Sequence, residues 1–403
     1  MTDLIRTPVI VGAARTPIGR YLGGLASLTA PQLGAVAIKA ALERAGVSPG
    51  DVNEVIMGNV LQAGVGQAPA RQAMLLAGVP SSVSAVTINK VCGSGLKAVM
   101  MAAQAIKAGD AQVIVAGGME SMSNAPHYVR GMRGGVKIGD QTMLDGMILD
   151  GLHCASCDVH MGRHAEHTAN KAKISRERQD AFAAQSHARA IAAQQGGHFN
   201  AEIVPVEVPG RKGPTMVTAD EGPRADTTAE SLARLRPAFP GSDKSESLSV
   251  TAGNASSLND GAAAIVVTSE AYAMRHNLTI LAHITAYATG AGDPQELFFA
   301  PITAVQNLMA RAGTAIGDYD LIEANEAFAS QALADGDGLG WDESRVNVRG
   351  GAIALGHPIG ASGARVLVTL LHALIDRGGR KGLATLCLGG GDAVALAVER
   401  RTT

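Results

Sequence analysis

Apolar runs alternate with helical patterns through the first 120 residues. The runs predict strands at 9–12, 54–57, 85–88 and 112–116. The helical patterns predict helices at 31–45, at 68–77 and directly after Cys92. Short strands separated by longer helices are typical of α/β proteins. We therefore expect an α/β fold.

The second half of the chain repeats the first. The segment Glu43-Arg-Ala-Gly-Val-Ser-Pro-Gly-Asp reappears as Ala310-Arg-Ala-Gly-Thr-Ala-Ile-Gly-Asp, 267 residues later. The same offset places Cys92 opposite Ile359. Internal repetition indicates structurally equivalent units. We therefore expect a duplicated fold, in which two α/β/α halves are related by pseudo-twofold symmetry.

The pattern changes between the two halves. This part of the chain is rich in Met and His, has Lys-Arg pairs and Pro-Gly turns, and contains one predicted helix at 177–195. It is too long for a linker, so we expect an inserted loop domain that covers the crevice between the halves. The expected domains are residues 1–121 together with 250–279, residues 122–249, and residues 280–403.

Composition narrows the class of protein. A net charge of −2 leaves no basic surface for nucleic acid. The N-terminus lacks the features of a signal peptide, and no apolar run approaches membrane length, so we expect no membrane association. Four cysteines in 403 residues are not a disulfide framework. We expect a cytoplasmic protein.

Three side chains stand at glycine-rich turns. Cys92 opens the run Cys-Gly-Ser-Gly ahead of a helical pattern, which places its thiol at a helix N-terminus. Helix dipoles favour thiolate there, so we expect a lowered pKa and a nucleophile. His357 stands in a similar turn, ahead of a helix expected at 364–375, and is the candidate base. Cys387 lies where an apolar run breaks into three glycines.

Four motifs resemble the catalytic signatures of the thiolase family, in its acetyl-CoA acetyltransferase branch. They are Asn89-Lys-Val-Cys-Gly-Ser-Gly, Asn325-Glu-Ala-Phe-Ala, Gly356-His-Pro-Ile-Gly-Ala-Ser-Gly and Cys387-Leu-Gly-Gly-Gly. The resemblance extends nearly end to end. It implies a reversible Claisen condensation of two acetyl-CoA molecules to acetoacetyl-CoA and CoA, through an acyl-cysteine intermediate.

The resemblance also implies roles. His357 activates Cys92, which takes the acyl group, and Cys387 removes the α-proton of the second substrate. The backbone N–H groups of Cys92 and Gly389 form one oxyanion hole, and His357 with a water held by Asn325 forms another. Glycine suits a position where backbone must approach a ligand. No cofactor is expected, because coenzyme A thioesters are the substrates.

Further residues are implied to bind acyl-CoA and CoA. They are His160, Met161, Arg224, Ser231, Phe239, Ala252, Ser256, Leu258, Leu297, Ala327 and Phe328. In addition, residues 131–145 resemble the thiolase tetramerisation loop. We therefore expect a homotetramer built as a dimer of dimers.

The chain departs from the family pattern in three places that bear on substrate. Leu297-Phe-Phe-Ala-Pro stands where a Met-Gly-Thr-Gly-Pro turn is usual, so Phe298 and Phe299 either restrict the acyl chain or repack the loop. The segment between Phe239 and Ala252 is longer than usual. Asp392-Ala393 replaces a residue-glycine pair after the glycine triplet.

Several alternatives remain open from the sequence. The nearest is a degradative 3-ketoacyl-CoA thiolase that acts on longer chains in fatty-acid β-oxidation. A decarboxylating condensing enzyme would have a second catalytic histidine where this chain has Asn325. A dinucleotide-binding oxidoreductase would have a G-x-G-x-x-G turn after the first strand, which this chain lacks.

A zinc site is chemically conceivable at one cluster, formed by Cys154, Cys157, His160, His164 and His167. However, four ligands within so few residues leave little room around a tetrahedral ion, and the resemblance assigns His160 to the acyl-CoA pocket. We therefore expect no metal. Cys154 and Cys157 depart from the family's usual residues at this wall of the pocket.

Overall fold

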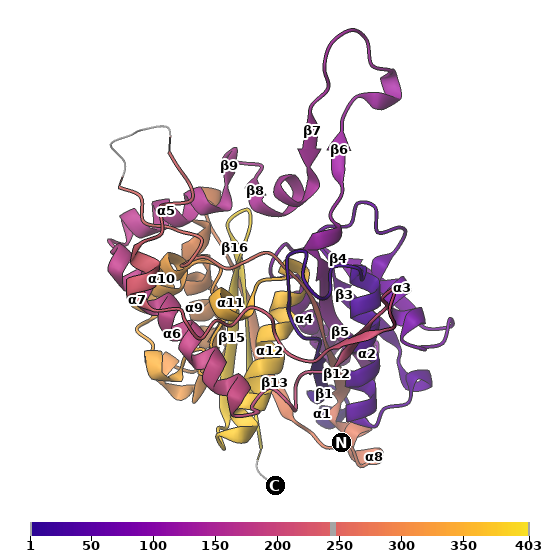
Figure 1. The fold of residues 1–403 in the computed structure, drawn as a ribbon. Coiled ribbons are helices and arrows are strands. Elements are labelled where there is room, and N and C mark those ends of the chain that lie inside the picture. The colour runs from indigo at the N-terminus through magenta and orange to yellow at the C-terminus, as the bar shows by residue number, and fades with distance from the viewer. Residues whose placement is uncertain (1, 242–246, 402–403) are drawn as a thin grey trace.

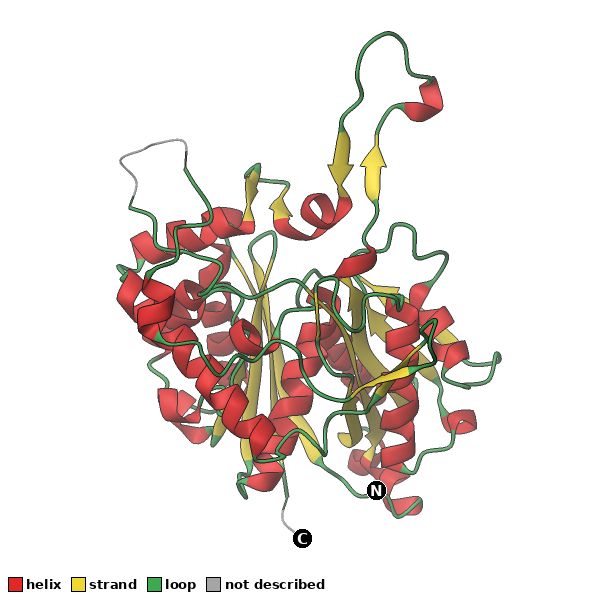
Figure 2. Cartoon of the chain, in the orientation of Figure 1, coloured by secondary structure: helices red, strands yellow, loops and turns green. Residues whose placement is uncertain are grey.

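A ten-stranded mixed sheet forms the framework of the chain (Figures 1 and 2). The computed structural model describes residues 2–241 and 247–401. The strands run in the order β14-β15-β16-β13-β1-β12-β5-β3-β4, and β2 pairs with β12. Their bounds are β1 (Pro8–Arg15), β2 (Gly19–Arg20), β3 (Glu54–Gly58), β4 (Ser84–Ile88), β5 (Val113–Ser121), β12 (Asn259–Ser269), β13 (Ala282–Ala291), β14 (Leu321–Ala324), β15 (Lys381–Leu388) and β16 (Asp392–Glu399).

The sheet is symmetric about its centre, where β1 and β13 pair antiparallel through Val9 and His283. Outward from this pair, β12 and β16 are antiparallel to β1 and β13. Next come β5 and β15, again antiparallel, and then β3 and β14, which are parallel to them. β4 adds one further strand to the N-terminal side. The predicted duplicated α/β fold is confirmed.

Two helices lie between the halves of the sheet, namely α4 (Ser94–Ala108) and α12 (Ile359–Asp376) (Figure 1). They approach closely, since a Cβ on Gly95 would lie 2.7 Å from the backbone nitrogen of Ala364, and one on Gly363 would lie 2.4 Å from that of Leu96. Within the described residues, α12 alone has the length and composition of a membrane-spanning helix, and it is buried in the core.

Other helices cover the outer faces. α2 (Ala30–Ala45) and α3 (Pro69–Leu76) pack on the N-terminal half, and α9 (Ala300–Ala312) packs on the C-terminal half. Thr29 and Gln32 form a capping box that begins α2, and Gly46 ends it in the left-handed conformation. The remaining helices and turns are α1 (Thr2–Ile5), α8 (Glu270–Arg275), α10 (Ala329–Leu339), α11 (Ala352–Leu355), η1 (Pro49–Asp51), η5 (Pro294–Phe299), η6 (Ile316–Asp318) and η7 (Glu343–Arg345).

The segment between β5 and β12 lies outside the sheet. It contributes helices α5 (Met161–Lys171), α6 (Arg176–Gln195) and α7 (Ala229–Ala233), and the hairpin of β6 (His127–Val129) and β7 (Met143–Asp145) projects from the body (Figure 1). The rest comprises η2 (Met122–Asn124), η3 (Met132–Gly134), η4 (Ile148–Leu152), β8 (His153–Cys154), β9 (Val159–His160), β10 (Val206–Val208) and β11 (Thr215–Val217). The lengthened stretch after Phe239 lies partly outside the described residues, at 242–246.

One helix boundary differs from its prediction. The helix after His357 was expected at 364–375, but α12 begins at Ile359. Pro358 stands at its N-cap, and the glycines of the following turn lie inside the helix. Gly360 is required there because a Cβ would lie 2.8 Å from the carbonyl oxygen of Met119 in β5. These glycines serve helix packing and do not form a loop.

Candidate active site

Cys92 lies in the turn between β4 and α4. Val91, just before it, has a φ of +44°, which is unfavourable for a β-branched residue. The hydroxyl of Ser94 stabilises this turn, because it accepts from the Lys90 N–H at 2.8 Å and donates to the Val91 carbonyl at 2.6 Å. The strained turn therefore holds the cysteine at the start of α4, as the sequence predicts.

Hydrogen bonds hold both the backbone and the ring of His357. Its backbone N–H donates to Oδ1 of Asn259 at 2.9 Å, which ties it to the N-terminal half. Its Nδ1 lies 2.6 Å from Oγ of Ser362, and that hydroxyl donates to the Pro358 carbonyl at 3.0 Å. We therefore assign the proton of the neutral ring to Nδ1, donating to Ser362. Nε2 then carries the free lone pair of a base.

Cys387 and Gly389 lie where β15 turns into β16. Cys387 is 2% exposed. The turn uses left-handed backbone at Gly390 and Gly391, with φ of +89° and +87°. The backbone N–H of Gly389 interacts with the thiol of Cys92. This loop therefore brings a second thiol and a backbone donor to the first thiol.

Burial dominates the pKa values of the catalytic side chains. Burial raises the pKa of Cys92 to about 12, although the N–H groups of Gly389 and Cys92 act in the opposite direction. Burial, with the charge of Arg365, lowers the pKa of His357 to about 3. Burial also raises the pKa of Cys387. The predicted lowered pKa of Cys92 is thus wrong for the unliganded site, because desolvation outweighs the helix terminus. The resting groups are a neutral thiol and a neutral imidazole.

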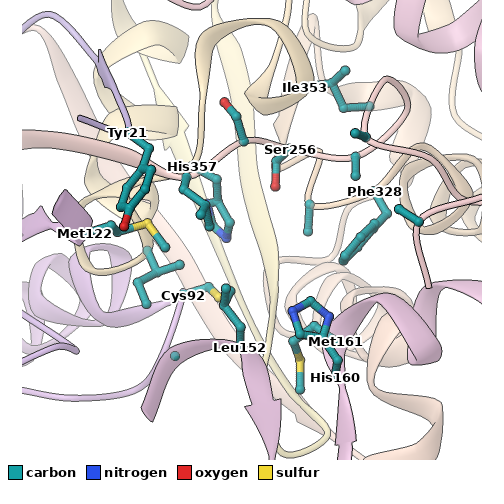
Figure 3. Close-up of a pocket in the computed structure, with 18 of the residues that line it drawn as sticks. Tyr21, Cys92, Met122, Leu152, His160, Met161, Ser256, Phe328, Ile353 and His357 are labelled. Carbon is teal, nitrogen blue, oxygen red and sulfur yellow. The ribbon is translucent and has the colours of Figure 1, made fainter. Parts of the chain in front are cut away.

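These groups line a cavity of about 660 Å³, in which His357 points toward Cys92 (Figure 3). Most of the predicted site residues line it as well. They are Cys92, His160, Met161, Arg224, Phe239, Ala252, Ser256, Leu258, Leu297, Ala327, Phe328, His357, Cys387 and Gly389. His160 stacks on Phe239, with ring centroids 4.9 Å apart. Residues far apart in sequence thus meet at one site.

Two predicted site residues are not among those that line the cavity. Asn325 is fully buried behind His357, with its Nδ2 3.5 Å from Nδ1 of the ring, and its Oδ1 has no hydrogen-bond partner among the described residues. Ser231 is exposed on α7, where it forms a capping box with Thr228. The structure therefore places Asn325 near the catalytic groups and Ser231 on the surface.

The structure adds lining residues that the sequence reasoning missed. They include Arg20, Tyr21, Met122, Met147, Ile148, Leu152, His187, Ile353 and Ile359. Several come from the methionine-rich segment after β5, whose composition was the available signal, although it has no periodicity that points to a cavity. His187 comes from α6, and its Nδ1 accepts from the Arg224 N–H at 3.2 Å.

Comparison with known proteins agrees with this geometry. Residues 8–271 match the model of the thiolase N-terminal domain, and residues 278–400 match that of the thiolase C-terminal domain. The chain belongs to the thiolase family. This thiolase is 56% identical over 393 residues to the acetyl-CoA acetyltransferase of Pseudomonas aeruginosa, covering 97% of this chain and 99% of that protein.

Two further relatives extend the likeness. The acetyl-CoA acetyltransferase of Cupriavidus necator is 56% identical over 402 residues, covering 100% of both chains. The crystal structure of the Bacillus anthracis acetyl-CoA acetyltransferase superposes with a TM-score of 0.94 at 41% identity, covering 98% of each chain. This thiolase therefore matches each of these proteins over 97% or more of its length.

Phe298 and Phe299, which depart from the family pattern, point in different directions. Phe298 is 3% exposed, lines the cavity beside Leu297, and contacts Phe328 edge to face at 5.4 Å. Phe299 packs near Leu333 of α10, and the ammonium group of Lys171 lies 5.5 Å from its ring centre. Of the two, only Phe298 therefore lines the cavity.

Proposed function

We propose that this protein is an acetyl-CoA acetyltransferase, which condenses two acetyl-CoA molecules reversibly to acetoacetyl-CoA and CoA. One observation carries the proposal: two thiols and a neutral imidazole converge at one cavity, beside the backbone N–H of Gly389. The relatives that match at 56% identity bear the same name. An acyl transfer with carbon–carbon bond formation needs a nucleophile, a base for it, an oxyanion hole and a second base.

The first half-reaction uses Cys92 and His357. Nε2 of His357 takes the thiol proton as the sulfur attacks the acetyl carbonyl, so the thiolate forms only when it is needed. The N–H groups of Cys92 and Gly389 stabilise the oxyanion. The imidazolium then returns its proton to the departing CoA thiolate, and Cys92 remains acetylated.

The second half-reaction uses Cys387. His357, neutral again, takes the proton of the Cys387 thiol. The resulting thiolate is a strong base, because burial raises the pKa of Cys387, and it removes the α-proton of the second acetyl-CoA. His357 and a water at Oδ1 of Asn325 stabilise the enolate oxygen, and the unpartnered state of Oδ1 supports that role. The enolate carbon attacks acetyl-Cys92 and acetoacetyl-CoA leaves, while the departing Cys92 thiolate takes its proton back from the His357 imidazolium.

Variants of the two cysteines separate these half-reactions. With Cys387→Ser we expect acetyl-CoA to label Cys92, as seen in intact-protein mass, while condensation falls by about 1000-fold or more. With Cys92→Ser, neither labelling nor condensation should occur. The substrate test compares kcat/KM for thiolysis of acetoacetyl-CoA and of an eight-carbon 3-ketoacyl-CoA. Preference for the longer substrate would assign the degradative activity instead, and cleavage of neither would refute both.

We further propose that the protein is a homotetramer, a dimer of dimers, that works in the cytoplasm. Support for the tetramer comes from the β6–β7 hairpin, on which Met132, Ile138 and Met143 are exposed. Support for a reducing compartment comes from the four free cysteines. The reaction needs no cofactor, because these side chains supply every group that it requires.

A further inference from the structure

Two cysteines and a histidine outside the catalytic groups lie together. The sulfur atoms of Cys154 and Cys157 and a ring nitrogen of His164 are all within 4.8 Å of one another. Cys154 is 3% exposed and His164 is 2% exposed, while Cys157 is half-buried. None of the three belongs to the cavity lining, so the catalytic mechanism does not use them.

The backbone explains why they meet. β8 and β9 form a short antiparallel pair, in which Cys154 lies opposite Val159. The connecting turn closes through a bond from the Asp158 N–H to the Cys154 carbonyl at 2.8 Å, and it places Cys157 beside Cys154. α5 then begins directly after β9, and its first turn brings His164 to the two thiols. The hairpin and the helix therefore build one compact corner.

One ring nitrogen of His164 is buried without a hydrogen-bond partner among the described residues. Its Nδ1 lies 3.4 Å from the backbone carbonyl of Gln295, which favours the proton on that nitrogen. Its Nε2 is buried and has no hydrogen-bond partner among the described residues. Buried polar atoms are almost always satisfied, so an orphan of this kind points to a missing ligand. A ring nitrogen oriented by a carbonyl on its other side is a common arrangement for metal-binding histidines.

We propose that Cys154, Cys157 and His164 bind one zinc ion. Two thiolates and an imidazole suit zinc in a tetrahedral site, whereas magnesium and calcium require oxygen ligands. The cluster has no fourth Cys, His, Asp or Glu ligand among the described residues, so a water molecule completes the coordination. Both thiols release their protons to solvent on binding.

The expectation of no metal assumed four ligands from a short stretch, with His160 among them. In the structure His160 stacks on Phe239 in the cavity wall and is outside the cluster. The three ligands that remain come from the hairpin and the first turn of α5, and they leave the fourth coordination position to water. The ion would fix β9, the strand that carries His160, and so this wall of the cavity.

The test uses the full-length enzyme, reduced and stripped with a chelator. Calorimetric titration with zinc should give one ion per chain and a higher melting temperature. Cobalt should give the absorption of a tetrahedral thiolate complex. Cys157→Ser and His164→Ala should weaken zinc binding by more than about 100-fold, since even loss of a group that only orients a ligand costs about 10–100-fold. Cys157 stands at a partly exposed turn, so its variant tests the proposal even if the buried His164→Ala variant fails to fold.

Two control variants show whether zinc binds at this corner or elsewhere. His167→Ala, one turn along α5, and Cys92→Ser should both keep the site. Zinc binding that disappears in Cys92→Ser but persists in Cys157→Ser would overturn the proposal in favour of metal at the catalytic thiols. A Cys154–Cys157 disulfide in protein purified under reductant would also overturn it, as would the absence of zinc binding. Because no outcome depends on turnover, failure here is distinct from failure of the proposed activity.

Discussion

Oγ of Ser362 lies 2.6 Å from Nδ1 of His357, and the same hydroxyl donates a hydrogen bond to the Pro358 carbonyl. Ser362 does not line the cavity, so it acts on the reaction only through the ring. It holds the imidazole in the tautomer that leaves Nε2 free for the thiol of Cys92. It is therefore a positioning residue for the base.

Ser362→Ala should lower kcat by about 10–100-fold, because the ring loses the acceptor that fixes its tautomer. KM should change little, since the hydroxyl does not reach substrate. Steady-state kinetics on a variant with unchanged circular dichroism would check this, and Ser362→Thr should restore part of the rate. A rise in KM with unchanged kcat would contradict the positioning role.

Alkylation of Cys92 should report its protonation. Burial raises the pKa of the thiol to about 12 and lowers that of His357 to about 3. The pair is therefore neutral across the physiological range, and the thiolate fraction increases as pH rises. The rate of labelling by iodoacetamide should increase continuously between about pH 6 and 10. A plateau below pH 6, read from the mass of the Cys92 peptide, would instead indicate a thiolate–imidazolium pair.

Phe298 should limit acyl-chain length. Removing its ring with Phe298→Ala opens the cavity beside Leu297. We expect kcat/KM for a six-carbon 3-ketoacyl-CoA, relative to acetoacetyl-CoA, to rise by about 10-fold or more, which is the scale of one or two methylene groups in a pocket. The matched control is Phe299→Ala, which should leave the ratio unchanged, because Phe299 packs near α10. An equal effect of both variants would contradict this assignment.

Lys90 and Asp392 form an ion pair between the turn that carries Cys92 and the hairpin that carries Gly389. Asp392→Asn should therefore loosen the position of the Gly389 N–H against the nucleophile. We expect kcat to fall by about 3–10-fold, with a smaller difference from the wild type at high salt, because the pair is partly exposed. Glu43→Gln, which removes the surface pair with Lys39, should have no effect. Initial rates at two ionic strengths would measure both.

The projecting hairpin should control assembly. Ile138 at its tip is fully exposed in the single chain, and a charge there is incompatible with an apolar contact between copies. Ile138→Asp should convert the tetramer to dimers, as measured by light scattering at micromolar concentration. Leu76→Asp, at another exposed apolar position on α3, should leave the mass unchanged. A monomer mass for the unmodified protein would refute the tetramer itself.

The sequence was most informative where local pattern determines structure. Alternation of short strands and helices predicted the α/β fold, and the repeat at Gly46 and Gly313 predicted its duplication. The motifs around Cys92 and His357 predicted residues that do meet at one cavity. Cys92 stands at a turn and Cys387 lies near the end of β15, directly before one. The glycines that these turns use are visible in the sequence.

Properties that depend on neighbours distant in sequence could not be predicted. The pKa of Cys92 is set by burial against Met122, Met147 and Ile359, which local motifs do not reveal. The directions of Phe298 and Phe299 follow from packing against Phe328 and α10. The start of α12 was placed too late, because its glycines resemble a loop until the contact with α4 is known.

The close contact of α4 and α12 joins two parts of the chain that are synthesised far apart in time. The nucleophile is synthesised within the first hundred residues, whereas its base and the second thiol follow only after residue 350. A nascent or truncated chain therefore carries a thiol without the imidazole that activates it. Activation of Cys92 by His357 is therefore possible only after α12 has docked against α4.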